Sequence, residues 1–199
     1  ELVSVCKLEK DELELVKNKF EFKFSSTDYK EMLNFSPLDG VIISSPHFAH
    51  YENAKEALLN NCHVLIEKPM TTNSESAIEL YQLAKEKNKE ILIPHGHNFK
   101  DYIPSAEQFI EEGHIGEIKH IDAAFASSLT DLFAGKPLAE AEKQKDIFRP
   151  KASTWSDPEK AGGYAWGQLS HMFAGVLKIT KLEADKVFCL SVPSPTKVD

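Results

Sequence analysis

The chain has 199 residues, of which 42% are hydrophobic and 27% are charged, which is enough for one large domain or for parts of two. Its formal net charge of −8, with no basic stripe to offset it, argues against a nucleic-acid partner. The apolar runs are far shorter than the roughly 20 residues that span a bilayer, and the three cysteines lack CxxC spacing, so we expect a cytoplasmic protein with no membrane partner.

Strand-like and helix-like segments alternate through the first hundred residues. Apolar runs and alternating patterns predict five strands, at 2–6, 20–24, 39–43, 62–66 and 90–93. Helical spacing of apolar residues predicts the intervening helices, at 9–19, 28–34, 47–60 and 72–88. This order is typical of a parallel sheet with crossover helices, and the β-branched run at 39–43 is of the kind buried on both faces.

Two of these helices begin with capping signals. Ser25, Ser26 or Thr27 can cap the helix at 28–34. Thr72, followed three residues later by Glu75, matches a capping box.

Beyond residue 100 the pattern changes. We expect a helix at 104–112, a strand at 117–126, a helix at 162–180 and a strand at 186–192. Between them, residues 127–160 are irregular and polar, which is long for a loop and suggests a functional excursion.

The segment Val64-Leu65-Ile66-Glu67-Lys68-Pro69-Met70 contains the first candidate for chemistry. It predicts a short buried strand that ends in an acid, a base and a proline. In open α/β sheets ligands bind beyond the carboxyl ends of the strands, so Lys68 is a candidate catalytic residue. On its own, a lysine is more often a solvated surface residue.

Four segments, taken together and in order, resemble the Gfo/Idh/MocA family of glucose-fructose oxidoreductase and inositol dehydrogenase. They are residues 39–46 with His50, the Glu-Lys-Pro segment at 63–70, residues 113–118, and Gly162-Gly163 followed by His171. The resemblance implies an α/β fold, with an incomplete Rossmann-like, doubly wound parallel sheet at 1–115. It also implies the start of an α+β substrate and oligomerisation domain with an open sheet at 116–199.

The resemblance also implies where an NAD or NADP cofactor would bind. The implied cofactor-binding residues are Ser44, Ser45, Pro46, His50, Glu67, Lys68 and Pro69. Lys68 would hydrogen-bond the substrate oxygen that exchanges a proton as hydride moves. The Lys68-Pro69 bond is a candidate for a cis peptide, which sequence does not decide.

His171 is the second implied catalytic residue, acting as acid or base against a sugar hydroxyl. The family often has an acidic residue one turn earlier, whereas this chain has Gly167 followed by Gln168. Without that carboxylate His171 would bind substrate and Lys68 would carry the proton transfer. A core histidine with a satisfied hydrogen bond remains the alternative.

Other polar and aromatic residues are candidates for substrate contacts. The resemblance places His97 and Asn98 at the mouth of the cleft, with Trp166 and Gln168 as further substrate-binding residues. A zinc pair at His95 and His97 is the weaker interpretation, since no acidic or cysteine partner stands at ligand spacing. Trp155, Tyr164 and Trp166 are candidates for stacking on a sugar face, and core packing is the alternative for Tyr164 and Trp166, the two on the predicted helix.

Lys7 follows the predicted strand at 2–6, where NAD enzymes often have an acidic residue for the ribose 2′-hydroxyl. A basic residue there favours NADP, although Lys7 is equally interpreted as a surface charge beside Glu9. The sequence has no GxGxxG turn, so the strand at 2–6 resembles the second strand of the family. We therefore expect a fragment of a longer chain that by itself binds dinucleotide poorly.

These observations favour an oxidoreductase that transfers hydride between a nicotinamide cofactor and a secondary alcohol of a sugar, cyclitol or related polyol. A catalytically silent dinucleotide-binding sensor is the alternative, motivated by Gly167. A lyase-type use of the same cofactor, which occurs among relatives, is not separated by sequence. The resemblance implies a homo-oligomer in the complete protein.

Overall fold

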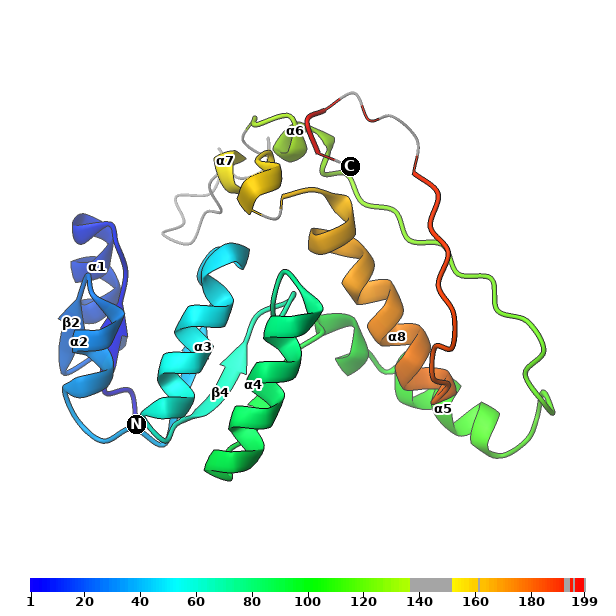
Figure 1. Cartoon of the computed structure of the whole chain (residues 1–199), viewed down its shortest axis with the longest axis horizontal. Helices are drawn as coiled ribbons and strands as arrows, with labels where there is room; N and C mark the ends of the chain where they lie inside the picture. Colours follow the sequence, from blue (N-terminus) through cyan, green and yellow to red (C-terminus); the bar gives the residue numbers. More distant parts are fainter. Residues whose placement is uncertain (137–151, 161, 192–193, 195, 199) are drawn as a thin grey trace. The chain divides into compact units, whose positions relative to one another are not determined.

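The computed structural model describes residues 1–136, 152–160, 162–191, 194 and 196–198 (Figure 1). These residues form two compact units, the first comprising Glu1–Leu92 and the second beginning at Ile93. Every helix within the described ranges is too short or too polar to cross a membrane. By their contacts, the two units divide after Leu92. The domain boundary predicted between 115 and 116 stays a prediction.

The first unit alternates strands and helices, and all its strand pairs are parallel, as the sequence predicts. One sheet pairs β1 with β2, and the other has the order β3-β4-β5 (Figure 1). In the larger sheet Gly40 lies opposite His63, and Val64 lies opposite Ile91. The elements are β1 Ser4–Cys6, α1 Lys10–Phe20, β2 Phe24–Ser26, α2 Tyr29–Asn34, β3 Gly40–Ile43, the 3₁₀ turn η1 His47–Ala49, α3 His50–Leu59, β4 His63–Ile66, α4 Ser74–Lys87 and β5 Ile91–Leu92.

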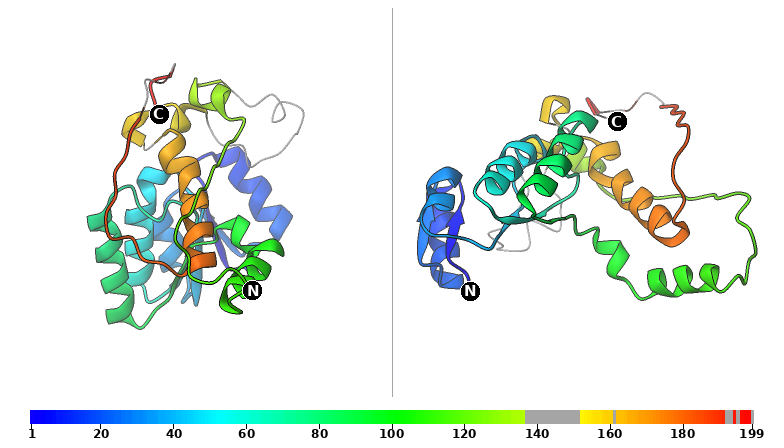
Figure 2. Two further views of the ribbon diagram at one scale, coloured as in Figure 1. Left: turned by 90° about the vertical axis from the view of Figure 1, so that its right-hand side faces the viewer. Right: turned by 60° about the horizontal axis from the view of Figure 1, so that its bottom comes forward.

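Small and branched apolar residues form the core of this unit. The helix α3 packs against β3, β4 and α4 (Figure 2). The buried side chains of these elements are Ile43, Ala54, Ala57, Leu58, Val64, Ile66, Leu80 and Ala84. On β3 successive side chains point to opposite faces, so Ile43 is only 5% exposed while Ile42 is 72% exposed. The prediction that this strand is buried on both faces is therefore wrong for the described residues.

The strand predicted at 20–24 is displaced. The helix α1 continues to Phe20, and Glu21 then adopts a left-handed conformation with φ of 57° that ends the helix. The strand β2 begins only at Phe24. The alternation of phenylalanines that predicted a strand instead places Phe20 and Phe22 edge to face, with ring centroids 6.5 Å apart.

Both predicted caps are also wrong, since the observed caps are the residues that directly follow Thr27 and Thr72. Asp28 is the N-cap of α2, and its carboxylate accepts a hydrogen bond of 2.8 Å from the amide of Lys30. Asn73, and not Thr72, is the N-cap of α4, where its side-chain oxygen accepts from the amide of Ser76 at 2.8 Å. Asp and Asn satisfy a free helix amide as well as Ser or Thr does, so a neighbouring match can mislead.

The second unit is helical in the residues that the structure describes. The helix α5 packs against α8 (Figure 1). Ile103 of α5 is buried, and Glu107 accepts hydrogen bonds from Lys178 and Lys181 across this contact. A π-helical turn leads into α8, where the sequence predicted one uninterrupted helix. The elements are the 3₁₀ turn η2 Gly96–Phe99, α5 Tyr102–Glu111, α6 Thr130–Phe133, α7 Ala152–Trp155, the 3₁₀ turn η3 Pro158–Lys160, the π turn η4 Ala165–Leu169 and α8 Ser170–Thr180.

The strands predicted at 117–126 and 186–192 are not formed in the described residues. Both segments have apolar residues suited to a strand, but in the described residues neither pairs with another strand. A β-ladder forms only between two paired strands. Val187, Phe188 and Leu190 are each 85% exposed. The open sheet expected for the second unit is thus absent from the described part of the chain. The predicted excursion at 127–160 contains α6, α7 and η3, and its residues 137–151 lie outside that part.

The three cysteines occupy different environments. The thiol of Cys62 is 1% exposed and lies 3.5 Å from the carbonyl oxygen of Leu38, whereas Cys189 is exposed. Burial raises the pKa of the thiols of Cys6 and Cys62, so both favour the protonated form.

Candidate active site

The Glu-Lys-Pro turn lies at the carboxyl end of β4. The amide of Glu67 donates to the carbonyl oxygen of Ile43 at 2.9 Å, which extends the pairing of β4 with β3 by one residue. The carboxylate of Glu67 accepts from the amide of Lys68 at 3.2 Å, and the Lys68-Pro69 peptide is cis. Lys68 therefore leaves the sheet at the edge where parallel sheets bind ligands.

Lys68 is only partly exposed. Burial lowers the pKa of its amine below the ordinary value for lysine, because the charged form loses solvation, and the carboxylate of Glu67 opposes this shift. Proton transfer is most efficient when the pKa of the group approaches the working pH. The environment of Lys68 thus moves its amine in the direction that acid-base chemistry needs.

The loop after β3 joins the same edge of the sheet. Ser44 and Pro46 are exposed, while the hydroxyl of Ser45 donates to Asn53 on α3 at 2.8 Å. His50, the first residue of α3, is fully buried, with Nδ1 2.7 Å from the carbonyl oxygen of Pro69 and Nε2 2.7 Å from that of Ser45. The structure thus joins these predicted cofactor residues to the Lys68 turn. Direct contact of His50 with the cofactor stays a prediction.

His171, on the first turn of α8, lies among aromatic rings of the second unit. Its ring centroid is 5.1 Å from that of His97, 5.9 Å from that of His95 and 6.2 Å from that of Phe125. No cluster of three or more side chains suited to a metal ion occurs in the described residues. The structure therefore brings together the predicted residues His97 and His171. Lys68 belongs to the first unit, and its predicted partnership with His171 stays a prediction.

Gly167 stands where the family resemblance led us to expect an acidic residue, and the space beside it is already filled. A Cβ atom at this position would lie 2.4 Å from Cζ3 of Trp155, far inside van der Waals contact. Trp155 in turn lies beside Phe133, with centroids 6.3 Å apart. Gly167 belongs to the π turn, a feature common at functional sites. The indole thus excludes any side chain at position 167.

The remaining predicted substrate residues flank this cluster. Trp166 is 41% exposed on the π turn, and Gln168 is partly exposed. Asn98 donates from Nδ2 to the carbonyl oxygen of Ala174 at 3.4 Å, which joins η2 to α8. Its Oδ1 is enclosed and has no hydrogen-bond partner among the described residues. Tyr164 donates its hydroxyl proton to the carbonyl oxygen of Phe125, and stacking of its ring on a sugar stays a prediction.

Lys7 follows β1 and is engaged by two carboxylates. Its Nζ lies 2.9 Å from Glu12 and 3.3 Å from Glu9. Burial lowers the pKa of Lys7, but the hydrogen bonds with Glu12 and Glu9 outweigh burial and raise the pKa above its ordinary value. Lys7 is thus a fixed cation whose charge is already balanced.

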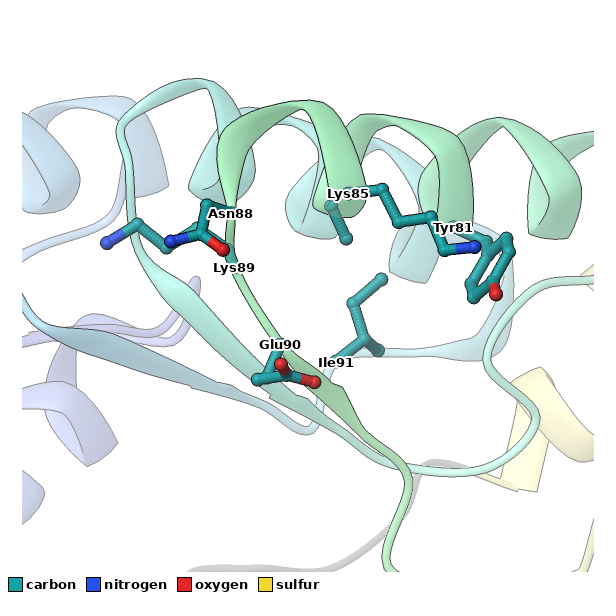
Figure 3. Close-up of a pocket in the computed structure, with 7 residues that line it drawn as sticks. Tyr81, Lys85, Asn88, Lys89, Glu90 and Ile91 are labelled. Carbon is teal, nitrogen blue, oxygen red and sulfur yellow. The ribbon is translucent and has the colours of Figure 1, made fainter.

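A separate pocket of about 390 Å³ lies between α4 and β5 (Figure 3). Lys85 reaches over the ring of Tyr81, with Nζ 4.3 Å from the centroid, and Glu90 and Ile91 line the strand side. This pocket adjoins the start of β5, whereas Lys68 follows the end of β4. Since the strands are parallel, the pocket and Lys68 lie at opposite ends of the strands.

Sequence reasoning missed His95 and Phe125 as neighbours of His171, and it missed Trp155 as the neighbour of Gly167. His95 was considered only as a zinc ligand, Phe125 only as part of a strand, and Trp155 only as a stacking residue. The spacing of His95 and His97 was the one available signal. The approach of Trp155 to Gly167 joins residues on separate elements and leaves no trace in local pattern.

Comparison with known proteins agrees with this architecture. The model of the Gfo/Idh/MocA family, an oxidoreductase family with an NAD-binding Rossmann fold, matches residues 1–95. Residues 1–95 are thus similar in sequence to the Gfo/Idh/MocA oxidoreductases. The family match includes the Glu-Lys-Pro turn and the loop that leads to His50.

Two curated relatives illustrate the range of similarity. An uncharacterized oxidoreductase of Synechocystis is 36% identical over 98 residues, which cover 49% of this chain and 26% of the relative. A 1-carboxy-3-chloro-3,4-dihydroxycyclohexa-1,5-diene dehydrogenase of Comamonas testosteroni is 26% identical over 144 residues, which cover 72% of this chain and 32% of the relative. The matched part of the chain thus spans about a quarter to a third of the length of these two relatives.

Solved structures share the fold over most of the chain. Myo-inositol 2-dehydrogenase from Lactobacillus plantarum superimposes with a TM-score of 0.72 at 20% identity, covering 91% of this chain and 49% of that one. A levoglucosan dehydrogenase solved with NADH and levoglucosan gives a TM-score of 0.70 at 19% identity, covering 88% and 44%. At such identities the likeness establishes the Rossmann-like fold alone.

Proposed function

We propose that this chain provides catalytic residues to an NAD(P)-dependent oxidoreductase that acts on a secondary alcohol of a sugar, cyclitol or related polyol. The observation that carries the proposal is Lys68, a partly buried lysine with a lowered pKa at the carboxyl end of β4 in a Gfo/Idh/MocA sequence. Among the relatives whose names state a substrate are dehydrogenases of an inositol, of levoglucosan and of a cyclic diol, and a hydratase of 2,7-anhydro-N-acetylneuraminate.

The exposed loop after β3 and the Glu-Lys-Pro turn fit the nicotinamide side of a dinucleotide site. Ser44 and Pro46 are exposed beside a turn whose backbone is fixed by His50, so a planar ring can approach without a change of backbone. The bound nicotinamide supplies hydride acceptance and donation. Lys68 would hold the substrate oxygen and take or return its proton. The role proposed for His171, taken by itself, is contact with a substrate hydroxyl.

The cofactor preference is proposed from Lys7. As a fixed cation after β1 it favours the 2′-phosphate of NADP. Its two carboxylate partners oppose that phosphate, so we expect only a small preference over NAD.

Replacing Lys68 tests the proposal. The variant Lys68→Ala should be made in the longest protein that can be expressed with this sequence. It should lower kcat for the best polyol substrate about 10²- to 10⁴-fold, which is the usual contribution of one acid-base group. Lys85→Ala is the matched control, because Lys85 is an exposed lysine of the same unit beside the separate pocket, and it should leave kcat unchanged. Equal turnover in wild-type and Lys68→Ala protein would reject the assignment.

A catalytically silent sensor is the second candidate, and Gly167 favours it. The indole of Trp155 occupies the space that a side chain at position 167 would need, so no orienting carboxylate can stand there. Retained dinucleotide binding without hydride transfer over a broad polyol panel would support the sensor, and any hydride transfer would exclude it.

A further inference from the structure

His50 makes two close contacts that one neutral imidazole cannot satisfy together. Nδ1 and Nε2 lie 2.7 Å from the carbonyl oxygens of Pro69 and Ser45, and both of these oxygens are acceptors only. A neutral imidazole has one N–H donor, and its other nitrogen presents a lone pair. With a single proton, one of the two contacts would therefore set a lone pair against a carbonyl oxygen in a site that is 0% exposed.

The lengths of the two contacts agree with a ring that donates twice. Neutral N–H···O bonds are usually about 2.9 to 3.0 Å long, whereas charge-assisted bonds shorten to about 2.7 to 2.9 Å. A buried cation is costly, and hydrogen bonds to all of its donors reduce that cost; two carbonyl oxygens would use both donors of an imidazolium. The two carbonyl oxygens belong to two different loops, so a small movement of one loop would not change both contacts.

Each carbonyl belongs to a loop that carries predicted site residues. The Pro69 carbonyl directly follows Lys68, and the Ser45 carbonyl belongs to the loop after β3. The two loops start from adjacent strands, which pair as far as the bond from Glu67 to Ile43. Beyond that bond, the His50 ring connects the two loops through its contacts with the carbonyl oxygens of Pro69 and Ser45.

We propose that His50 is a positioning residue that donates from both ring nitrogens at once, as an imidazolium, and so clamps the Lys68 turn to the Ser45 loop. Its neighbours include the buried ring of His47, with centroids 5.9 Å apart, and the charged side chains of Glu67 and Lys68 that precede Pro69. The clamp itself does not depend on the proposed oxidoreductase activity. Its value for catalysis does, because it fixes the backbone from which Lys68 extends.

The protonation of the ring is measured directly by nitrogen NMR. We would record long-range proton-nitrogen spectra of the histidine-labelled 199-residue chain at neutral pH and assign His50 by its absence from His50→Gln. The expected result is two protonated-type ring nitrogens for His50, each with a proton protected from exchange with solvent. One nitrogen with the shift of a free lone pair would overturn the proposal, whatever the activity of the protein.

Hydrogen exchange tests the clamp in the same chain. Because each lost charge-assisted bond is worth at least about tenfold in a local opening equilibrium, His50→Gln should accelerate exchange about tenfold or more in both 44–49 and 67–72. His120→Gln is the control, since His120 is exposed in the second unit, and it should leave these segments unchanged. Protection of the α4 amides reports whether His50→Gln remains folded.

Two exchange results would contradict the clamp. One is acceleration in a single segment, and the other is none in a variant that keeps α4 protected. If His50→Gln does not fold, the nitrogen spectrum of the wild-type chain decides alone, with assignment through the other histidine variants. Loss of polyol turnover without a change in these spectra would count against the proposed function and not against the clamp.

Discussion

The charge next to Lys68 makes a testable contribution to its chemistry. Burial lowers the pKa of Lys68 and the carboxylate of Glu67 raises it, so Glu67→Gln should lower that pKa further. If neutral Lys68 accepts the proton in alcohol oxidation, activity rises with pH through this pKa, and the variant should show its rise at lower pH. The measurement is the pH profile of kcat/KM.

The Glu67→Gln exchange is well matched, because the carboxamide oxygen of glutamine can still accept from the Lys68 amide. An unshifted profile, or a rise displaced to higher pH, would show that Lys68 does not control that limb.

At position 167 the structure predicts that glycine is required. Gly167→Ala should lower the free energy of unfolding by about 1 to 3 kcal/mol, because the added methyl overlaps the ring of Trp155. In a Trp155→Ala background the same change should cost much less. The measurement is a double-mutant cycle by denaturant unfolding, and additive costs would contradict the contact.

Gly175→Ala supplies the control for helix effects. A Cβ there meets its nearest atoms at 3.9 and 4.0 Å, which is ordinary contact, and alanine favours the interior of α8. This variant should therefore be neutral or slightly stabilised.

Among the elements, α4 separates the two candidate caps. Asn73→Ala removes the side-chain acceptor of the Ser76 amide and should cost about 0.5 to 2 kcal/mol of stability. Thr72→Ala should cost clearly less, because Thr72 is not the cap of the helix. Urea unfolding of both variants decides the matter, and a larger loss for Thr72→Ala would restore the capping-box interpretation.

The elements also show how far local pattern reaches. The sequence predicted the order of strands and helices in the first unit, the parallel pairing and the position of Lys68, because apolar periodicity and the Glu-Lys-Pro segment are local signals. It misplaced β2 because the end of α1 depends on the left-handed Glu21, and alternating phenylalanines match a strand equally well. It missed the enclosure of His50 and the Trp155 contact, since both depend on side chains brought together only by folding.

For the molecule as a whole, the segment 186–191 is an accessible apolar strip. Phe188 is 85% exposed, so Phe188→Lys should leave the melting temperature nearly unchanged and should reduce concentration-dependent association. Light scattering over a concentration series measures the association, with Lys186→Arg as the charge-conserving control. Unchanged association in Phe188→Lys would exclude this strip as the surface through which copies of the chain associate.

The distribution of cysteines gives the protein an internal reporter. Cys189 is open to solvent, while Cys62 is 1% exposed and bonded to the Leu38 carbonyl at the start of β4. A thiol-specific dye therefore marks Cys189 in the native state and reaches Cys62 only when the central strand loosens. The labelling rate of Cys62 therefore measures how often the sheet that supports Lys68 opens locally.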